Sequence, residues 1–270
     1  MMYRFWKHAA AMLLAAVLLL GTARAEAMNV LLVGVDSEDG AGRSDTMMLA
    51  RVDAESGEVR LVSFLRDLYV SIPGFGRTRL NAAYVYGGVE LLKSTLNETF
   101  GVEADRTVTV DFSLLRELVD AVGGVEVHLT RAEAGQINKE LDGSALTEGT
   151  ALLNGEQALC YSRIRKIDSD FQRTARQQTV IAALLKRAGE MDLFSLARLA
   201  TRFLGKVQTD MTLADVAALM PLVRHADEWT LETARVPFAG AYSDETIGGM
   251  QVLVPDLAAN RRKLAAFLEP

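Results

Sequence analysis

The sequence has few of the residues and motifs from which a functional site is usually read. It contains a single cysteine, Cys160, so an internal disulfide bond is impossible. The apolar neighbours of Cys160 favour a small buried group, with a nucleophile as the alternative. The three histidines, His8, His128 and His225, lie far apart in the sequence, which argues against a histidine metal site. P-loop, GxSxG and HExxH motifs are also absent.

Positive charge is scarce as well. The formal net charge of the 270 residues is −6. Residues 1–25 hold three cations and no acid, so the rest of the chain has 26 basic and 35 acidic residues, a net charge of −9. A body this acidic argues against nucleic-acid binding. Any anion that the protein binds must therefore meet a local cluster of cations.

The N-terminus carries an uncharged, mostly apolar run that is short for a membrane span. As a helix its fifteen residues, 9–23, would extend about 22 Å, less than the ~30 Å hydrocarbon core of a bilayer. A basic leader precedes the run, and the small-x-small triplet Ala23–Ala25 follows it. We expect residues 1–25 to be a cleaved signal peptide, with a short retained membrane anchor as the alternative. Either places residues 26–270 outside the cytoplasmic membrane.

The rest of the chain alternates between the patterns of strands and helices, without a linker, repeat or low-complexity stretch. Apolar runs and a hairpin-like turn at 53–58 predict strands, and apolar residues at helical spacing predict helices. The expected strands are 29–36, 46–53, 58–65, 106–112, 125–129 and 229–238, and the expected helices are 86–101, 113–124, 176–190, 192–205 and 212–226. This alternation predicts one α/β domain with helices on both faces of a central sheet.

Two acidic residues follow one another around the end of the first expected strand. Asp36 ends the run "VLLVGVD", and Asp45 lies in the turn "GRSDT". Two carboxylates on neighbouring loops can hold a hard cation such as Mg²⁺, which prefers oxygen ligands. The alternative is an acid that ends a strand and another that starts a turn. Spacing alone favours this structural alternative.

Arginines supply the opposite charge. Arg66 directly follows the apolar "VSFL" and precedes Asp67, so it is either ion-paired or aimed at a ligand. Asp36 and Arg66 both fall at strand ends, where open α/β sheets bind their ligands. Arg79 and Asn81 come just before an expected helix.

The segment "YSRIRKIDSDFQRTARQQ" concentrates the most positive charge. Arg163 and Arg165 alternate as on a strand and would share one face. Arg173 and Arg176 are three apart at a helix start and would be neighbours on that helix. Guanidinium groups bind phosphate with paired hydrogen bonds, and a helix N-terminus adds amide donors. An anion site and a solvated charged loop remain open as alternatives. The cations are Arg163, Arg165, Lys166, Arg173 and Arg176.

Taken together, these segments resemble the LytR–CpsA–Psr family of cell-wall enzymes. The resemblance rests on seven blocks in family order, which makes it specific. They are "VLLVGVD", "GRSDTMML", "SFLRDLYV", "RLNAAYVYGG", "VDFSLLRELVDAVGGVEV", "LLNGEQALCYSRIRKIDSDFQRTARQQTVI" and the late "VLVPD". The resemblance implies a single three-layer α-β-α domain with a central mixed sheet, the catalytic domain at 26–270.

The resemblance also implies a function. Family members move glycopolymers, such as wall teichoic acid, from an undecaprenyl-pyrophosphate carrier to peptidoglycan, forming a phosphodiester. The implied partners are the polyprenyl-pyrophosphate-linked glycan, the peptidoglycan acceptor and the membrane surface, with no nucleic acid. The implied place is the outer face of the cytoplasmic membrane or the cell wall. The alternatives are a hydrolase of polyprenyl or sugar pyrophosphates and a non-catalytic lipid-carrier binding or regulatory module.

By the same resemblance, the site residues fall into two groups. Asp36 and Asp45 match the metal-binding acids, with Mg²⁺ the expected ion and Mn²⁺ the alternative. These two acids and Arg66 are the expected catalytic residues. The expected pyrophosphate-binding residues are Arg66, Arg79, Arg163, Arg165, Arg173 and Gln177. The prenyl tail needs an apolar groove, for which the segments 179–185, 194–204 and 216–223 are candidates, although three core helices would look the same.

Overall fold

A computed structural model describes residues 27–36, 42, 44–203, 205–219 and 229–269. The expected signal peptide or anchor at 1–25 lies outside these residues. None of the helices within the described ranges is long and apolar enough to cross a membrane.

The centre of the fold is a six-stranded sheet in the order β10-β3-β2-β1-β6-β9. β1 runs parallel to β6 and β3 parallel to β10, whereas the other neighbours are antiparallel. The predicted mixed sheet is therefore confirmed. The strands are β1 (Met28–Val35), β2 (Ser44–Asp53), β3 (Glu58–Phe64), β6 (Arg106–Asp111), β9 (Gln208–Thr209) and β10 (Thr230–Val236).

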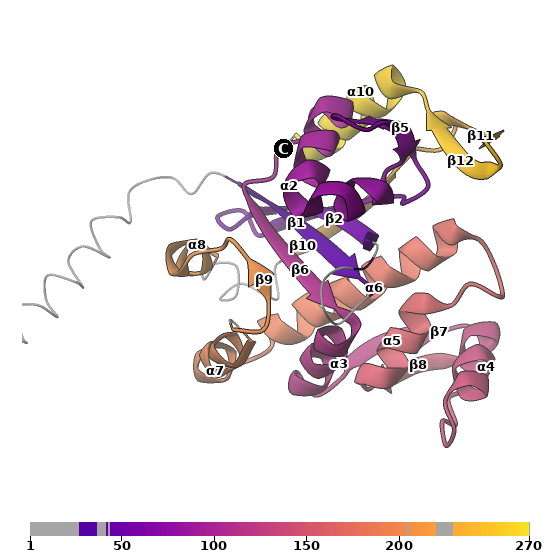
Figure 1. Cartoon of the computed structure of the whole chain (residues 1–270). Coiled ribbons are helices and arrows are strands. Elements are labelled where there is room, and N and C mark those ends of the chain that lie inside the picture. Colours follow the sequence, from indigo (N-terminus) through magenta and orange to yellow (C-terminus); the bar gives the residue numbers. More distant parts are fainter. Residues whose placement is uncertain (1–26, 37–41, 43, 204, 220–228, 270) are drawn as a thin grey trace, which may run out of the picture.

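Helices cover both faces of this sheet, as the alternating pattern predicted (Figure 1). α2 (Asn81–Phe100) and α10 (Leu257–Leu268) pack on the face that carries Leu31, Val33 and Val35. α6 (Asp170–Gly189) packs on the other face, which carries Leu32 and Met48. Side chains alternate between the faces of a strand, so both faces of β1 are apolar and both need a cover. The result is the three-layer α-β-α arrangement.

A second group of elements packs against α6 on the lower side in Figure 1. It shares a buried cluster that includes Val127, Ile137, Tyr161 and Val180. The elements are α3 (Phe112–Ala121), β7 (Val125–Leu129), α4 (Arg131–Glu140), β8 (Gly149–Leu153) and α5 (Gly155–Arg163). The expected helix at 113–124 and strand at 125–129 are confirmed, and β8, α4 and α5 are additions.

The expectation that Arg163 and Arg165 alternate on a strand is wrong. Arg163 is the last residue of α5, and Arg165 lies in the segment that follows. The helix begins with a capping box in which Asn154 and Gln157 satisfy each other's backbone amides. Because this capping box starts a helix at Gly155, Arg163 lies at the end of the helix and Arg165 lies in the loop after it.

Two hairpins and two further helices complete the described part of the chain. The hairpin of β4 (Tyr69–Ile72) and β5 (Gly76–Arg79) precedes α2, and that of β11 (Tyr242–Ile247) and β12 (Met250–Pro255) precedes α10. α2 starts earlier than expected, is interrupted at Gly87 and Gly88, and ends at Gly101 in the left-handed conformation, φ 73°. α7 (Leu193–Phe203) agrees with the expected helix at 192–205. α8 (Leu213–Ala218) is shorter than expected, and 220–228 are outside the described residues.

Candidate active site

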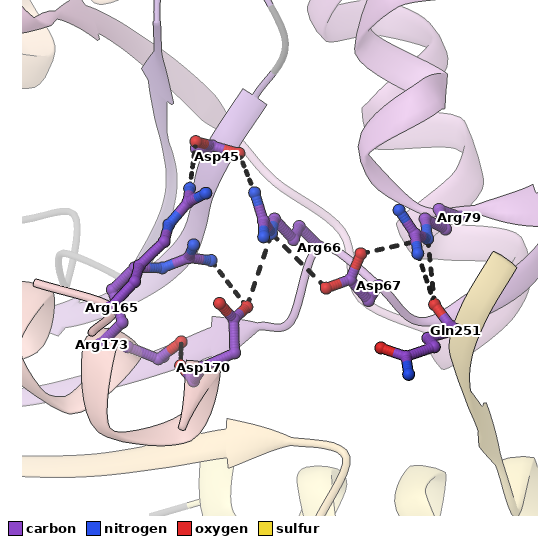
Figure 2. A network of polar contacts seen from close by, with 9 residues as sticks. Asp45, Arg66, Asp67, Arg79, Arg165, Asp170, Arg173 and Gln251 are labelled. Carbon is purple, nitrogen blue, oxygen red and sulfur yellow. Dashed lines mark hydrogen bonds and ion pairs between the residues drawn. The ribbon is translucent and has the colours of Figure 1, made fainter. Parts of the chain in front are cut away.

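Charged side chains from four parts of the chain meet at one end of the sheet (Figure 2). Asp45 lies near the start of β2, and Arg66 follows the end of β3. Arg165 follows α5, and Arg173 lies in the first turns of α6. Strand ends and helix starts at one edge of a sheet bring side chains together that are more than a hundred residues apart in sequence.

Asp45 is held between two arginines. One carboxylate oxygen accepts a hydrogen bond of 2.8 Å from Arg66, and the other accepts one of 2.8 Å from Arg165. Burial alone would raise the pKa of Asp45, but the hydrogen bond and charge of Arg66 outweigh it, helped by Arg165 and Arg173. The pKa is therefore lowered, and the group stays ionised at neutral pH.

Arg66 is the hub of the network. Its guanidinium donates to Asp45, and its Nε lies 3.5 Å from both Asp67 and Asp170. Burial favours the neutral form, but the hydrogen bond to Asp45 and the surrounding carboxylates raise the pKa of Arg66. Three acids thus fix one guanidinium in a single orientation.

Arg173 is buried but incompletely paired. Its side chain is 2% exposed and donates to Asp170 at 2.7 Å. Its Nε and Nη1 are buried without a hydrogen-bond partner. Burial, reinforced by the charges of Arg66 and Arg165 against the opposing pull of Asp170, lowers the pKa of Arg173 to about 10. Unmet donors on a buried cation are costly, so this side chain is arranged for an anion.

Arg176 does not belong to this group, although it lies one turn further along α6. It makes two hydrogen bonds of 2.7 Å to Asp168, one of 3.2 Å to Glu133 and one of 2.9 Å to the carbonyl of Ile164. The sequence analysis counted it among the five cations of this segment and not among the expected pyrophosphate-binding residues. Arg176 ties α6 to α4 and to the loop that carries Arg165.

Arg79 reaches the network through Asp67. Its Nε lies 3.2 Å from the Asp67 carboxylate, and its guanidinium donates to the carbonyl of Gln251 at 2.6 Å and 3.2 Å. Asp67 therefore lies between Arg66 and Arg79 (Figure 2). Asp67 is therefore placed to orient the guanidinium groups of both arginines.

An apolar pocket opens beside Arg173. It lies between the sheet, α3 and α6. Arg163, Arg165 and Gln177 line it together with Asp45 and Arg173. The guanidinium carbon of Arg163 lies 4.4 Å from the centre of the Phe112 ring, which also lines the pocket. The apolar walls include Leu32, Met48, Val108, Leu118, Ile181 and Leu184.

One of the three candidate segments for the apolar groove contributes to this pocket. Val180, Ile181 and Leu184 come from the candidate segment 179–185 and line the pocket. The described residues of the candidate segments 194–204 and 216–223 do not. The pocket thus combines a cationic mouth with an apolar interior.

The two predicted metal-binding acids line a second pocket. Asp36 and Asp45 lie there with Glu140, Glu156 and Cys160. No group of three or more His, Cys, Asp or Glu side chains arranged for a metal occurs among the described residues. Burial and the hydrogen bond to Glu140 raise the pKa of Cys160 to about 12, which excludes a thiolate nucleophile at neutral pH.

The sequence analysis missed two residues of the site. Asp170 bridges Arg66 and Arg173, and the only signal was its position three residues before Arg173 at a helix start. Phe112 was counted only as part of a strand, and nothing local linked it to Arg163. The structure brings the predicted residues Asp45, Arg66, Arg165 and Arg173 into one network. Arg79 joins through Asp67, and Arg163 and Gln177 line the adjoining pocket.

The chain is similar to known proteins of one family. A model of the LytR_cpsA_psr family matches residues 14–265. The chain is 35% identical over 199 residues to the polyisoprenyl-teichoic acid–peptidoglycan teichoic acid transferase TagU of Enterococcus faecalis, over 71% of this chain and 64% of that protein. It is 30% identical over 207 residues to the corresponding transferase TagT of Bacillus subtilis, over 73% of this chain and 64% of that protein. It thus spans just under two thirds of the length of these relatives.

A solved structure of TagT bound to LIIa-WTA shares the fold. The TM-score is 0.76 at 26% sequence identity, with 90% of this chain and 91% of that chain covered. Fold and site first define a class: a three-layer α/β domain with a cluster of arginines at the mouth of an apolar pocket. More specifically, the chain belongs to the LytR_cpsA_psr family, because the family match covers most of its length.

Proposed function

We propose that this protein transfers a glycopolymer from a polyprenyl-pyrophosphate carrier to peptidoglycan at the outer face of the cytoplasmic membrane. The observation that carries the proposal is Arg173, a buried arginine with unmet donors at the mouth of an apolar pocket. A diphosphate would satisfy those donors, and a prenyl tail would fill the pocket. The family membership and the relatives named as teichoic acid transferases support the same reaction.

The proposed step is a phosphoryl transfer. A hydroxyl oxygen of peptidoglycan attacks the phosphorus that carries the glycan, and a new P–O bond forms. The bond to the bridging oxygen of the diphosphate breaks, and polyprenyl phosphate leaves with the bond's electrons. The hydroxyl proton passes to a base. Such a reaction depends mainly on positioning and on stabilisation of negative charge.

The charged residues divide this work. Arg173 and Arg165 hold the diphosphate at the pocket mouth, with Arg163 and Gln177 beside them. Arg66, fixed by Asp45, Asp67 and Asp170, stabilises the charge that develops on the leaving phosphate. Arg79 supports Arg66 through Asp67.

A divalent ion fits the donor set. Asp36 and Asp45 line one pocket and offer carboxylate oxygens, the ligands that Mg²⁺ and Mn²⁺ prefer. Each Asp45 oxygen accepts from one guanidinium and keeps a further lone pair. Bound there, the ion would supply positive charge against the diphosphate. Asp36 and Asp45 would hold it.

Mass spectrometry of the products tests the function. The full chain is incubated with a glycan on polyprenyl pyrophosphate, peptidoglycan fragments and Mg²⁺. A glycan–phosphate–peptidoglycan adduct is expected with the wild type and with Arg131→Ala, whose arginine is 92% exposed and outside the site. Arg66→Ala should lower the rate about 10²–10³-fold.

The other outcomes separate the alternatives. Free glycan phosphate and carrier phosphate without an adduct would indicate hydrolysis with water as the acceptor. Binding of the carrier without any product would indicate a non-catalytic module. Either result would overturn the proposed transfer.

A further inference from the structure

α7 contributes no residue to the proposed site. The sequence analysis counted it among candidates for the lipid groove, but the apolar pocket is lined from the sheet, α3, α5 and α6, and the described residues of α7 take no part. Its inner face is accounted for, because Phe203 is buried and Leu196 and Leu199 are partly buried. The outer face needs a separate explanation.

That outer face joins an aromatic ring to cations. Phe194 is 85% exposed, more than any other large apolar side chain among the described residues. Arg198 and Arg202 follow at intervals of four residues and are also exposed. Residues four apart are neighbours on a helix, so Phe194, Arg198 and Arg202 lie along one side of α7. The guanidinium carbon of Arg202 also lies 5.2 Å from the centre of the Phe203 ring.

The local charge contrasts with that of the whole protein. Residues 193–206 contain Arg198, Arg202 and Lys206 and no acid, whereas the chain as a whole has a net charge of −6. The acids just before α7 are engaged: Asp192 accepts from the backbone amides of Phe194 and Ser195, and Glu190 pairs with Arg187. An exposed aromatic beside cations on a helix is typical of contact with an anionic lipid surface.

The position of α7 relates this face to the pocket. Leu184 lines the pocket about 16 Å along α6 from Arg173, close to the end of α6 from which the chain continues into α7. Lys206, just after α7, pairs with Glu117 of α3, beside the pocket residue Leu118. Leu118 and Leu184 are only partly buried, so this end of the pocket reaches the surface. Figure 1 shows α7 to the left of α3, next to the end of α6.

We propose that the outer face of α7 rests on an anionic membrane surface, with Phe194 inserted among the headgroups and Arg198 and Arg202 on the lipid phosphates. This contact would set the far end of the pocket against the bilayer in which a polyprenyl carrier resides. The proposal rests on the proposed function only for that carrier. The lipid contact itself is inferred from the exposure of Phe194, from the helical spacing of the arginines and from the local excess of positive charge.

A fluorescent probe at position 194 tests the contact. In the full chain with Cys160→Ala, Phe194→Cys is labelled with an environment-sensitive dye. The matched control is Phe75→Cys, at a ring that is 55% exposed on the turn between β4 and β5. With vesicles of phosphatidylglycerol and phosphatidylcholine, the probe at 194 should shift to the blue and be quenched by headgroup-level nitroxide lipids. The probe at 75 should not respond.

Charge variants sharpen the result. Neutralising Arg198 or Arg202 to Gln should raise the lipid concentration for the half-maximal shift roughly fivefold each. Arg131→Gln, at an exposed arginine of α4, should leave it unchanged. Circular dichroism confirms that each variant is folded. A probe at 194 that stays in water with phosphatidylglycerol present, or responds equally to phosphatidylcholine alone, would overturn the proposal.

The measurement is independent of the transfer reaction, because it needs neither carrier nor acceptor. A blue shift without any transfer product would leave the lipid contact standing and remove the proposed function. A transfer product without a charge-dependent blue shift would leave the proposed function standing and remove the lipid contact.

Discussion

Two arginines one turn apart on α6 have opposite surroundings. Arg176 is 4% exposed in its side chain and donates to Asp168, to Glu133 and to a backbone carbonyl. Arg173 is 2% exposed and has one partner, Asp170, with two buried nitrogens unpaired. Burial acts against the charge of both, yet the pKa of Arg176 is raised and that of Arg173 is lowered.

The difference separates a structural arginine from a binding arginine. Both terminal nitrogens of Arg176 are paired and only its Nε lacks a partner, so this cation contributes to the fold. A cation with unmet buried donors lowers the stability of the unliganded protein and gains when an anion arrives. The pairing of the terminal guanidinium nitrogens, complete in Arg176 and half complete in Arg173, therefore distinguishes the two roles where burial and position on the helix do not.

The largest expected effect concerns Arg173. Arg173→Met should lower the rate of transfer about 10²–10³-fold, because the diphosphate loses its buried donors. The same change should leave the thermal stability equal or higher, because an incompletely paired charge leaves the interior. Product mass spectrometry and a melting curve measure the two effects. A variant that transfers at the wild-type rate would contradict the binding role.

Arg176→Met should have the opposite pattern. It leaves Asp168 and Glu133 without their cation, so the free energy of unfolding should fall by roughly 3 kcal/mol, as for a broken buried ion pair. Urea unfolding measures the loss, and the second change Asp168→Asn should restore part of it. If Arg176→Met is as stable as the wild type, the comparison between the two arginines fails.

A third prediction concerns the apolar half of the site. Leu184→Trp places a larger side chain at the far end of the pocket. Long prenyl chains should lose about tenfold in affinity, because part of their apolar burial is blocked. A short prenyl chain should bind as before. Titrations with the two chain lengths test this, and an equal loss for both would mean that the tail lies elsewhere.

The stacking of Arg163 on Phe112 should have a smaller effect. Phe112→Leu keeps an apolar wall and removes the ring that lies 4.4 Å from the guanidinium carbon. A cation–π contact contributes about 1 kcal/mol, so the KM for the carrier should rise no more than about fivefold. Steady-state kinetics with Phe112→Tyr as the conservative control measure this effect. A full loss of activity would show that the ring has another role.

The smallest effect is on the pH dependence of stability. The hydrogen bond and charge of Arg176 lower the pKa of Asp168 in the folded protein. A lowered carboxyl pKa adds stability above the unfolded-state pKa of about 3.9, and this is lost as the pH falls through the folded value. Between about pH 5 and 3 the wild type should thus lose more stability than Asp168→Asn. Acid titration of the melting temperature measures the difference, and parallel curves would contradict the assignment.

The fold was largely predictable because its signals are local. The run at 30–36 and the turn at 53–58 gave β1 and the β2–β3 hairpin, since burial on two faces and turn composition show in adjacent residues. The strand expected around Arg163 failed because the alternation in "YSRIR" was weighed above the capping box at Asn154 and Gln157. The helix that starts after Asn154, nine residues before Arg163, determines the conformation at Arg163.

The site was only partly predictable because its contacts are not local. Residue types and strand ends pointed to Asp45 and Arg66. Only the family resemblance separated Arg173 from Arg176, because Glu133, a partner of Arg176, lies 43 residues away in the sequence. Asp170 was missed for a similar reason, since its bond to Arg66 joins two distant elements. Residue spacing shows which side chains share a face of a helix. It does not show which residues of other elements pack against that face.

Calorimetric titration of prenyl pyrophosphate tests the central claim most directly. The full chain, Arg173→Met and the exposed control Arg131→Met are each titrated with a prenyl pyrophosphate and with the matching prenyl alcohol. The wild type and Arg131→Met should bind the pyrophosphate at least tenfold more tightly than the alcohol, since charged hydrogen bonds contribute about 1.5–3 kcal/mol. Arg173→Met should lose most of that preference. If it keeps the preference in full, the unpaired donors of Arg173 are not the diphosphate site.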